Sequence, residues 1–364
     1  MFRVAEIVAF SVFFIISFIK LFSIGLIDIN ILTYFYYFIL SLFLGRHYLL
    51  NKPTRVNYLF ITLMLSIGWL SMISLIGIRS ESFGIAKLLS LTLSILSIPI
   101  AVYMVRKDLL EAAVMVTTAS ILFLTVLFFI FGTYDETDPA YILNEVYLHG
   151  SFLSGFMIFL SLLLRMSMVL PFLLLICMIV LGGRGPMLSF LIVSMFLLMS
   201  VGFSLIYRPK LRKSSLIHSF VSFPLLMSSI LYLIPDLFDR TLNRWSVIFA
   251  SSGVGDSAQR RIDHIYTSLA AFESSPIVGI GIANYGLFMD GFHSKSYPHN
   301  FILEILAESG LVGGLPFLIC VGLIFIKSLG NKTWSLLLYV CVCLLISYSY
   351  ATSNEFYFAL TLAI

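Results

Sequence analysis

The chain has 364 residues, of which 60% are hydrophobic and 11% are charged, and its mean hydropathy is +1.04. Soluble domains are typically about 45–50% apolar and about 25% charged, so this composition excludes a soluble globular fold and favours a helical membrane protein. The net charge of +4 reflects basic loops rather than a nucleic-acid-binding surface, and no nucleic-acid partner is expected.

Apolar runs long enough to cross a bilayer follow one another along the chain. A spanning helix needs about 20 apolar residues. The predicted spans are 4–26, 31–50, 56–78, 83–105, 109–131, 149–164, 166–182, 186–207, 215–235, 299–326 and 335–351, with a short last segment at 356–364. We therefore predict an all-α polytopic membrane protein of about 11–12 transmembrane helices, with residues 1–364 forming a single integral membrane domain.

Basic residues between the spans predict the topology. Those that fall on one side of the membrane are Arg3, Arg46, Lys52, Arg55, Arg106, Lys107, Arg165, Arg208, Lys210, Arg212, Lys213, Lys327 and Lys332. By the positive-inside rule this side is the cytoplasm, and the N-terminus lies there. The acidic loop 132–148 and the longest loop, 236–298 between spans nine and ten, fall on the opposite side.

The long loop contains a predicted helix. Within 261–272, apolar residues recur with helical spacing on one face. They are Ile262, Ile265, Tyr266, Leu269 and Phe272. The pattern predicts an amphipathic helix that lies on the outer membrane surface or over a cavity. Because proline bars helix continuation, we expect the helix to stop before Ser274-Ser275-Pro276.

Seven basic residues lie on the side that the positive-inside rule disfavours: Arg79, Arg184, Arg240, Arg244, Arg260, Arg261 and Lys295. Arg244, Arg260 and Arg261 belong to the long loop, and such residues are either solvated or bound to phosphate oxygens, with which Arg forms bidentate contacts. Arg184 follows Gly182-Gly183 and precedes Gly185-Pro186. It is either part of a tight turn and snorkels to the interface, or it lies at an anion site beside a helix N-terminus.

The start of the span 299–326 gathers polar residues. Asn300, Glu304 and Glu308 are spaced four apart and therefore share one helix face. Glu304 would complement the helix dipole, whereas Glu308 lies deeper and should face the bundle interior or a water-filled cavity. His299 is either an ordinary interfacial histidine or a general base, since its ordinary pKa lies near the operating pH.

No HExxH motif, DxD pair or Cys/His ligand spacing occurs in the sequence, so no metal or other cofactor is predicted. The four cysteines lie in apolar runs and are interpreted as small buried side chains.

Several of these residues, taken in order and spacing, resemble the core of the O-antigen ligase/polymerase superfamily. The resemblance covers roughly 180–315 and rests on Gly183-Arg184-Gly185, Arg261, Pro276-Ile277-Val278-Gly279-Ile280-Gly281, His299-Asn300, Gly310 and Gly313. In that family an arginine precedes a P-x-x-G-x-G turn, and an HN segment with two downstream glycines enters a helix. Members often carry Trp four residues after the arginine, where this chain has Ile265, so either Arg260 or Arg261 is the family's arginine.

The resemblance implies a GT-C-like, metal-independent glycosyltransferase of the bacterial inner membrane that acts on the periplasmic face. Its donor would be an oligosaccharide on undecaprenyl diphosphate, and its other partners the lipid bilayer and a chain-length regulator protein. Arg184 and Arg261 would hold the diphosphate and His299 would act as the base. The implied substrate-binding residues are Arg244, Arg260, Asn300, Glu304 and Glu308.

Three functions remain open. A Wzy-type polymerase, which extends a lipid-linked chain, is preferred because polymerases are the more numerous and diverse group of the superfamily. A WaaL-type ligase would transfer the glycan to lipid A–core. A lipid-linked oligosaccharide flippase would place charges at mid-membrane depth, whereas here Lys20 and Lys87 are the only basic residues within apolar runs.

Overall fold

A computed structural model describes residues 58–76, 81–103, 107–131, 142–207, 256–292, 296–331, 333–349 and 353–364. Within these ranges every regular element is an α-helix. The predicted spans 4–26, 31–50 and 215–235 lie outside the described residues, as does Arg244.

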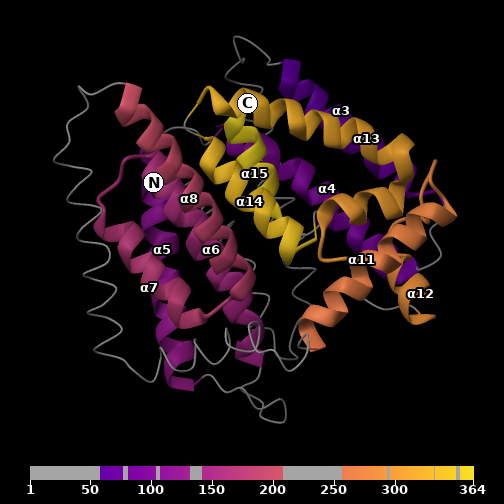
Figure 1. The fold of residues 1–364 in the computed structure, drawn as a ribbon, viewed down its shortest axis with the longest axis horizontal. Coiled ribbons are helices and arrows are strands. Elements are labelled where there is room, and N and C mark those ends of the chain that lie inside the picture. The colour runs from indigo at the N-terminus through magenta and orange to yellow at the C-terminus, as the bar shows by residue number, and fades with distance from the viewer. Residues whose placement is uncertain are drawn as a thin grey trace, which may run out of the picture.

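Each predicted span within the described ranges corresponds to a helix (Figure 1). The helices are α3 (Tyr58–Ser74), α4 (Glu81–Tyr103), α5 (Lys107–Phe131), α6 (Ile142–Leu163), α7 (Val169–Leu181), α8 (Arg184–Tyr207), α11 (Asp256–Ser274), α12 (Tyr285–Asp290), α13 (Phe301–Leu329), α14 (Trp334–Ile346) and α15 (Asn354–Ala363). By length and composition, Leu109–Val126 and Phe301–Leu329 could cross a membrane, and shorter apolar helices accompany them. This arrangement is consistent with a helical membrane protein.

The helices pack as two groups that α14 joins. Helices α5, α6, α7 and α8 form one group, α3, α4, α13 and α15 form the other, and α14 contacts both (Figure 1). Small residues let apolar helices approach closely, and Gly155 of α6 lets α14 approach α6 in this way. The Tyr339 hydroxyl of α14 donates to the Phe152 carbonyl at 3.0 Å, and a Cβ at Gly155 would lie 2.1 Å from that hydroxyl oxygen.

The ends of several helices meet in one place. The Ile282 amide donates to the Ser74 carbonyl at the end of α3 (3.0 Å). Just after α14, the Tyr348 hydroxyl donates to the Leu148 carbonyl near the start of α6 (2.7 Å). Gly185, at the start of α8, faces Ser347, which follows α14. The starts of α6 and α8 therefore lie near the ends of α3 and α14, as expected if successive helices run in opposite directions. The side of the membrane that these helix ends face stays a prediction.

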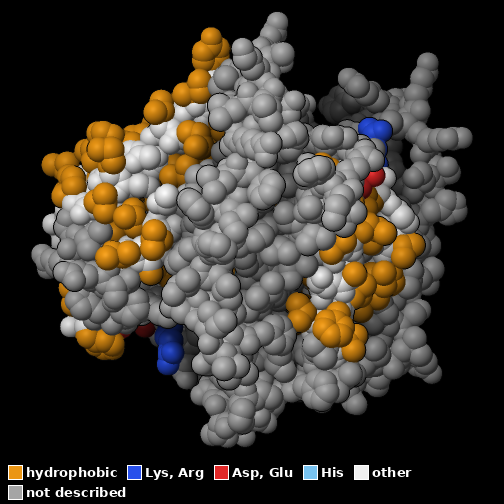
Figure 2. Space-filling model, turned by 180° about the vertical axis from the view of Figure 1, so that it is seen from behind, with side chains coloured by type: hydrophobic (Ala, Val, Ile, Leu, Met, Phe, Trp, Pro, Cys, Tyr) orange, Lys and Arg blue, Asp and Glu red, His pale blue; other side chains and the backbone are white. Residues whose placement is uncertain are grey.

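Apolar side chains also cover much of the outside of the described helices. On α3 and α13, Leu65 is 68% exposed and Ile326 is 66% exposed. Figure 2 shows hydrophobic side chains gathered on both sides of the molecule as seen from behind. Such surfaces are costly in water but suit contact with lipid.

Candidate active site

A break in α13 builds the frame of the site. Gly310 has φ 60° and ψ −164°, which interrupts the helix. The interruption frees the amides of Leu311 and Val312 and the carbonyls of Ala307 and Glu308 from their usual partners. Such groups must find other hydrogen bonds, above all in an apolar environment.

The segment Pro276–Gly281, called the glycine turn here, supplies these partners. Leu311 and Val312 donate to the carbonyls of Pro276 and Ile277, at 2.9 and 3.0 Å. In return, the amides of Ile280 and Gly281 donate to the carbonyls of Ala307 and Glu308, at 2.8 and 3.0 Å. The turn thus replaces the missing helix bonds and fastens the loop after α11 to α13.

Glycine is required where the turn and the helix touch. A Cβ on Gly279 would lie 2.3 Å from the Glu308 carbonyl carbon, and one on Gly310 would lie 2.4 Å from the Ile277 carbonyl oxygen. Both residues also have positive φ, which glycine adopts without a steric cost. The P-x-x-G-x-G pattern and Gly310 therefore both allow the close backbone contact between the glycine turn and the break in α13.

His299 lies directly before α13 in a fixed orientation. Its φ of 54° is unusual for a residue with a side chain. Its Nδ1 lies 3.3 Å from the Ser347 carbonyl, and since a carbonyl can only accept, Nδ1 carries the hydrogen and Nε2 the lone pair. Tyr297 packs on the imidazole with ring centroids 4.3 Å apart, and its hydroxyl donates to the same carbonyl.

Helix α11 brings its arginines toward this histidine. The ring of His264, one turn after Arg260 and Arg261, meets the His299 ring edge-on with centroids 5.2 Å apart. Both arginines are exposed. Burial lowers the pKa of His299, and Arg261 lowers it further. His299 is therefore a neutral acceptor at neutral pH, within the electrostatic reach of Arg261.

The apolar face predicted for α11 is present and is in large part exposed. Ile265 is 40% exposed and Tyr266 is 68% exposed, whereas His264, Ser268 and Ala271 form the buried face. The helix ends at Ser274, close to the predicted stop. An apolar stripe left free in this way is what a helix on a lipid surface presents.

Lys87 of α4 joins the two glutamates of α13 in a buried charge cluster. Its Nζ donates to Glu304 Oε1 at 2.5 Å and to Glu308 Oε1 at 2.7 Å. Both glutamates are 0% exposed, so Glu308 faces the interior as predicted. The shared helix face is confirmed for Glu304 and Glu308, whereas Asn300 lies before the helix in extended conformation. Ser349 Oγ also donates to Glu304 Oε1 at 2.6 Å, and the Ala283 amide donates to Glu308 Oε1 at 3.0 Å.

Two of the predicted site residues, Asn300 and Arg184, lie at helix starts. Asn300 is the N-cap of α13, and its Oδ1 accepts from the amides of Ile302 and Leu303, a strongly preferred way to satisfy a helix start. Arg184 is the first residue of α8. A Cβ on its neighbour Gly185 would lie 2.1 Å from Ser347 Oγ, so the backbone at Arg184 starts beside the residue whose carbonyl binds His299. Substrate binding by Asn300, Glu304, Glu308 and Arg244 stays a prediction.

Sequence reasoning did not assign Lys87, His264, Tyr297 or Ser347 to the site. Lys87 carried the clearest signal, because a lysine within an apolar run needs a counter-charge. His264 faces away from the apolar stripe of its helix and could have been noticed for that reason. The role of Ser347 rests on its backbone carbonyl, which no side-chain pattern reveals.

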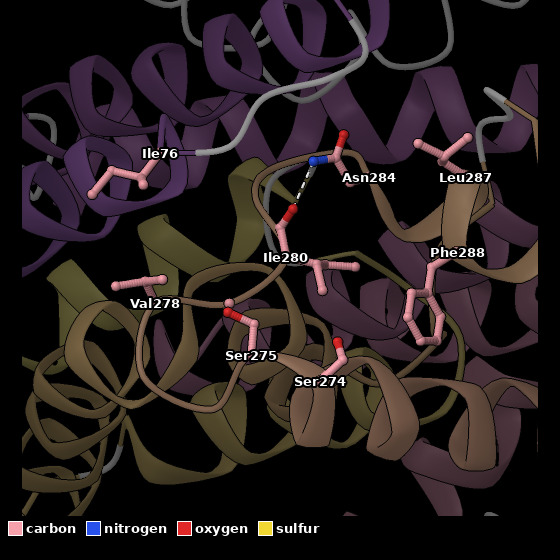
Figure 3. Close-up of a pocket in the computed structure, with 9 residues that line it drawn as sticks. Ile76, Ser274, Ser275, Val278, Ile280, Asn284, Leu287 and Phe288 are labelled. Atoms are coloured by element: carbon pink, nitrogen blue, oxygen red, sulfur yellow. Dashed lines mark hydrogen bonds between the residues drawn. The ribbon is translucent and has the colours of Figure 1, made fainter.

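A cavity of about 410 Å³ opens between the end of α11, the glycine turn and α12. Figure 3 shows its lining residues, with Asn284 Nδ2 donating to the Ile280 carbonyl at 2.6 Å. The lining consists of Ile76, Ser274, Ser275, Val278, Gly279, Ile280, Asn284, Leu287 and Phe288. These lining residues are apolar or uncharged, so the cavity can contact an apolar chain or hydroxyl groups.

Comparison with known proteins gives one family. Residues 169–318 match the family model described as O-antigen ligase (Wzy_C). The matched stretch includes α7, α8, the glycine turn, His299 and the break in α13. No curated protein matches the chain. Residues 169–318 are therefore similar to the domain of the O-antigen ligase family, whose members are membrane-embedded enzymes that transfer glycans.

Proposed function

We propose that this protein is an O-antigen polymerase that transfers a glycan from undecaprenyl diphosphate to a lipid-linked sugar acceptor at the periplasmic face. The observation that carries the proposal is an oriented, neutral His299 within the electrostatic reach of Arg261 on α11. A base beside permanent cations suits a reaction in which a hydroxyl attacks and a diphosphate leaves.

The proposed transfer uses His299 as the base. Its Nε2 takes the proton of the acceptor hydroxyl while that oxygen bonds to the anomeric carbon of the donor. The bond from this carbon to the diphosphate oxygen breaks, and the electron pair leaves with undecaprenyl diphosphate. Arg261 and Arg260, together with Arg184, stabilise the negative charge on the leaving group, so that the step needs no metal ion. The Ser347 carbonyl holds the Nδ1 hydrogen throughout.

The exposed arginines of α11 provide a first test. Arg261→Ala is expected to slow transfer about a hundredfold, roughly 3 kcal/mol, because one preorganised charge partner of the leaving group is lost. Arg260→Ala measures the second arginine separately and so identifies the family's arginine. Transfer is measured with purified protein and lipid-linked glycan. Gln259→Ala, on the same exposed stretch of α11, is the control and should keep full activity; equal losses in all three variants would contradict the assignment.

A ligase is the second candidate, since the matching family model is described as O-antigen ligase. Deleting the gene and separating lipopolysaccharide by gel electrophoresis distinguishes the two. Loss of a polymerase leaves core carrying a single repeat unit, whereas loss of a ligase leaves bare core and accumulated lipid-linked polymer. An unchanged ladder in the deletion strain would reject both. Co-purification with a chain-length regulator protein would add support for the polymerase.

A further inference from the structure

We propose that His264 is a positioning residue for the reaction at His299: its imidazole, which Tyr285 holds in place, keeps the His299 ring in the orientation that presents Nε2 to the acceptor hydroxyl. This role rests on the function proposed above. Its structural basis is a contact between the two imidazoles, whose ring centroids lie 5.2 Å apart at an interplanar angle of 79°. His264 belongs to α11 and His299 directly precedes the N-cap of α13, so the contact joins the arginine-bearing helix to the base.

The hydrogen bond from His299 to Ser347 is not sufficient to fix the imidazole. Nδ1 lies 3.3 Å from the carbonyl oxygen, whereas N–H···O bonds are usually about 2.9–3.0 Å long. Even a bond of ordinary length contributes little net stability, because water offers the same donor an alternative partner. The last side-chain torsion of histidine is also broad and is not confined to narrow rotamers. Neighbouring side chains must therefore restrict the rotation of the ring.

Among the described residues, two rings contact the His299 imidazole. Tyr297 meets it with centroids 4.3 Å apart and an interplanar angle of 53°, and His264 meets it nearly perpendicular. Tyr297 lies only two residues before His299 and can move with it. His264, in contrast, is part of a 19-residue helix, and the turn that follows this helix is hydrogen-bonded to the break in α13. His264 is therefore the neighbour that ties the His299 ring to the fixed frame of the site.

Tyr285 fixes both the orientation and the tautomer of His264. Its hydroxyl lies 3.0 Å from the His264 carbonyl, to which it donates, and 3.0 Å from His264 Nδ1. A hydroxyl group has one hydrogen. Because the carbonyl accepts that hydrogen, Nδ1 must donate to the hydroxyl oxygen, and Nε2 carries the lone pair. Tyr285 is 0% exposed and His264 is 9% exposed, so water competes little for these bonds.

Steady-state kinetics of three His264 variants separate the contact between the rings from the hydrogen bond to Tyr285. His264→Phe keeps a ring against His299, whereas His264→Asn keeps a donor toward Tyr285 and loses the ring. We expect kcat to fall about 10- to 100-fold in His264→Ala and His264→Asn, because a small misplacement of a catalytic group is costly, while KM stays nearly unchanged. His264→Phe should recover most of the wild-type kcat. A wild-type kcat in His264→Asn would overturn the proposal, as would equal losses in His264→Phe and His264→Ala.

Nitrogen NMR of the full-length protein with isotope-labelled histidine, in lipid nanodiscs at neutral pH and without glycan, tests the orientation of His299 independently of transfer. The two neutral tautomers give distinct spectra, and the signals of His299 are those that disappear in His299→Asn. In wild type they should show the Nδ1–H tautomer alone. In His264→Ala, or in His264→Asn if the alanine variant does not accumulate, they should move toward the average of both tautomers, whereas His264→Phe should leave them in place. Unchanged His299 signals in the variant without a ring would overturn the proposal. If the signals move as expected and the wild-type protein transfers no glycan, only the proposed function fails.

Discussion

Replacing His299 with alanine is expected to abolish glycan transfer while leaving the protein folded. The variant loses the Nε2 lone pair, the acceptor for the proton of the attacking hydroxyl. A positioned base typically contributes about 10²- to 10⁴-fold to a rate, and the lower end of this range would already remove the polymer ladder from a gel. Purified His299→Ala should therefore show at least a hundredfold slower transfer, with an unfolding temperature close to that of wild type.

The backbone at His299 demands a second variant. Its φ is 54°, and a left-handed conformation costs about 1–2 kcal/mol for most residues but is tolerated by asparagine. His299→Asn keeps this conformation without a base, and it should be as inactive as the alanine variant. Tyr297→Phe loses only a hydroxyl that donates to Ser347 and should retain most of the activity. A complete ladder from His299→Ala or His299→Asn at normal protein level would reject the role of His299.

The pH profile gives an independent check of the same role. Burial lowers the pKa of His299 from its ordinary 6.5, and only the neutral ring can accept a proton. The rate of transfer should therefore stay constant as the pH falls to 6.5, and it should decline only at lower pH. The linked stability has the same sign: the unfolded chain binds this proton more tightly, so the folded state loses stability as the pH falls below 6.5. An inflection above 6.5 would contradict the buried, neutral His299.

Local sequence patterns were sufficient to predict the helices and part of the site. Apolar runs predicted the helices of the described ranges, because contact with lipid requires uninterrupted apolar helices. A helical period gave α11, and the four-residue spacing placed Glu304 and Glu308 on one face. Each of these properties depends on residues within a few turns of one another, so a single segment contains all the information.

Long-range contacts account for what the sequence did not predict. Lys87 reaches Glu304 across 217 positions, and no pattern within either segment identifies its partner. The buried face of α11 carries His264 and Ser268 instead of the apolar stripe, because Tyr285 and His299 offer polar and aromatic contacts there. The break in α13 depends on a turn some thirty residues earlier, and a lone glycine within an apolar run does not reveal it.

The change Gly310→Ala is expected to disrupt the site without touching any charged residue. With φ 60° and ψ −164°, this position lies in a region that is essentially restricted to glycine, at a cost of about 1–3 kcal/mol for other residues. The added methyl group would lie 2.4 Å from the Ile277 carbonyl oxygen and 2.6 Å from the Gly279 nitrogen. Since both are backbone atoms, the turn must move away and the four hydrogen bonds to α13 must weaken. We expect a lower unfolding temperature and a strong loss of transfer.

Gly322 of the same helix provides the matched control. A Cβ there meets nothing within 4 Å, and Gly→Ala within a helix is favourable by up to about 1 kcal/mol, so Gly322→Ala should be as stable and active as wild type. Similar behaviour of the two variants would mean that the turn does not depend on Gly310. If only Gly310→Ala loses stability and activity, close contact between the P-x-x-G-x-G turn and Gly310 is required. This contact fastens the loop after α11 to α13, the helix that begins directly after His299-Asn300.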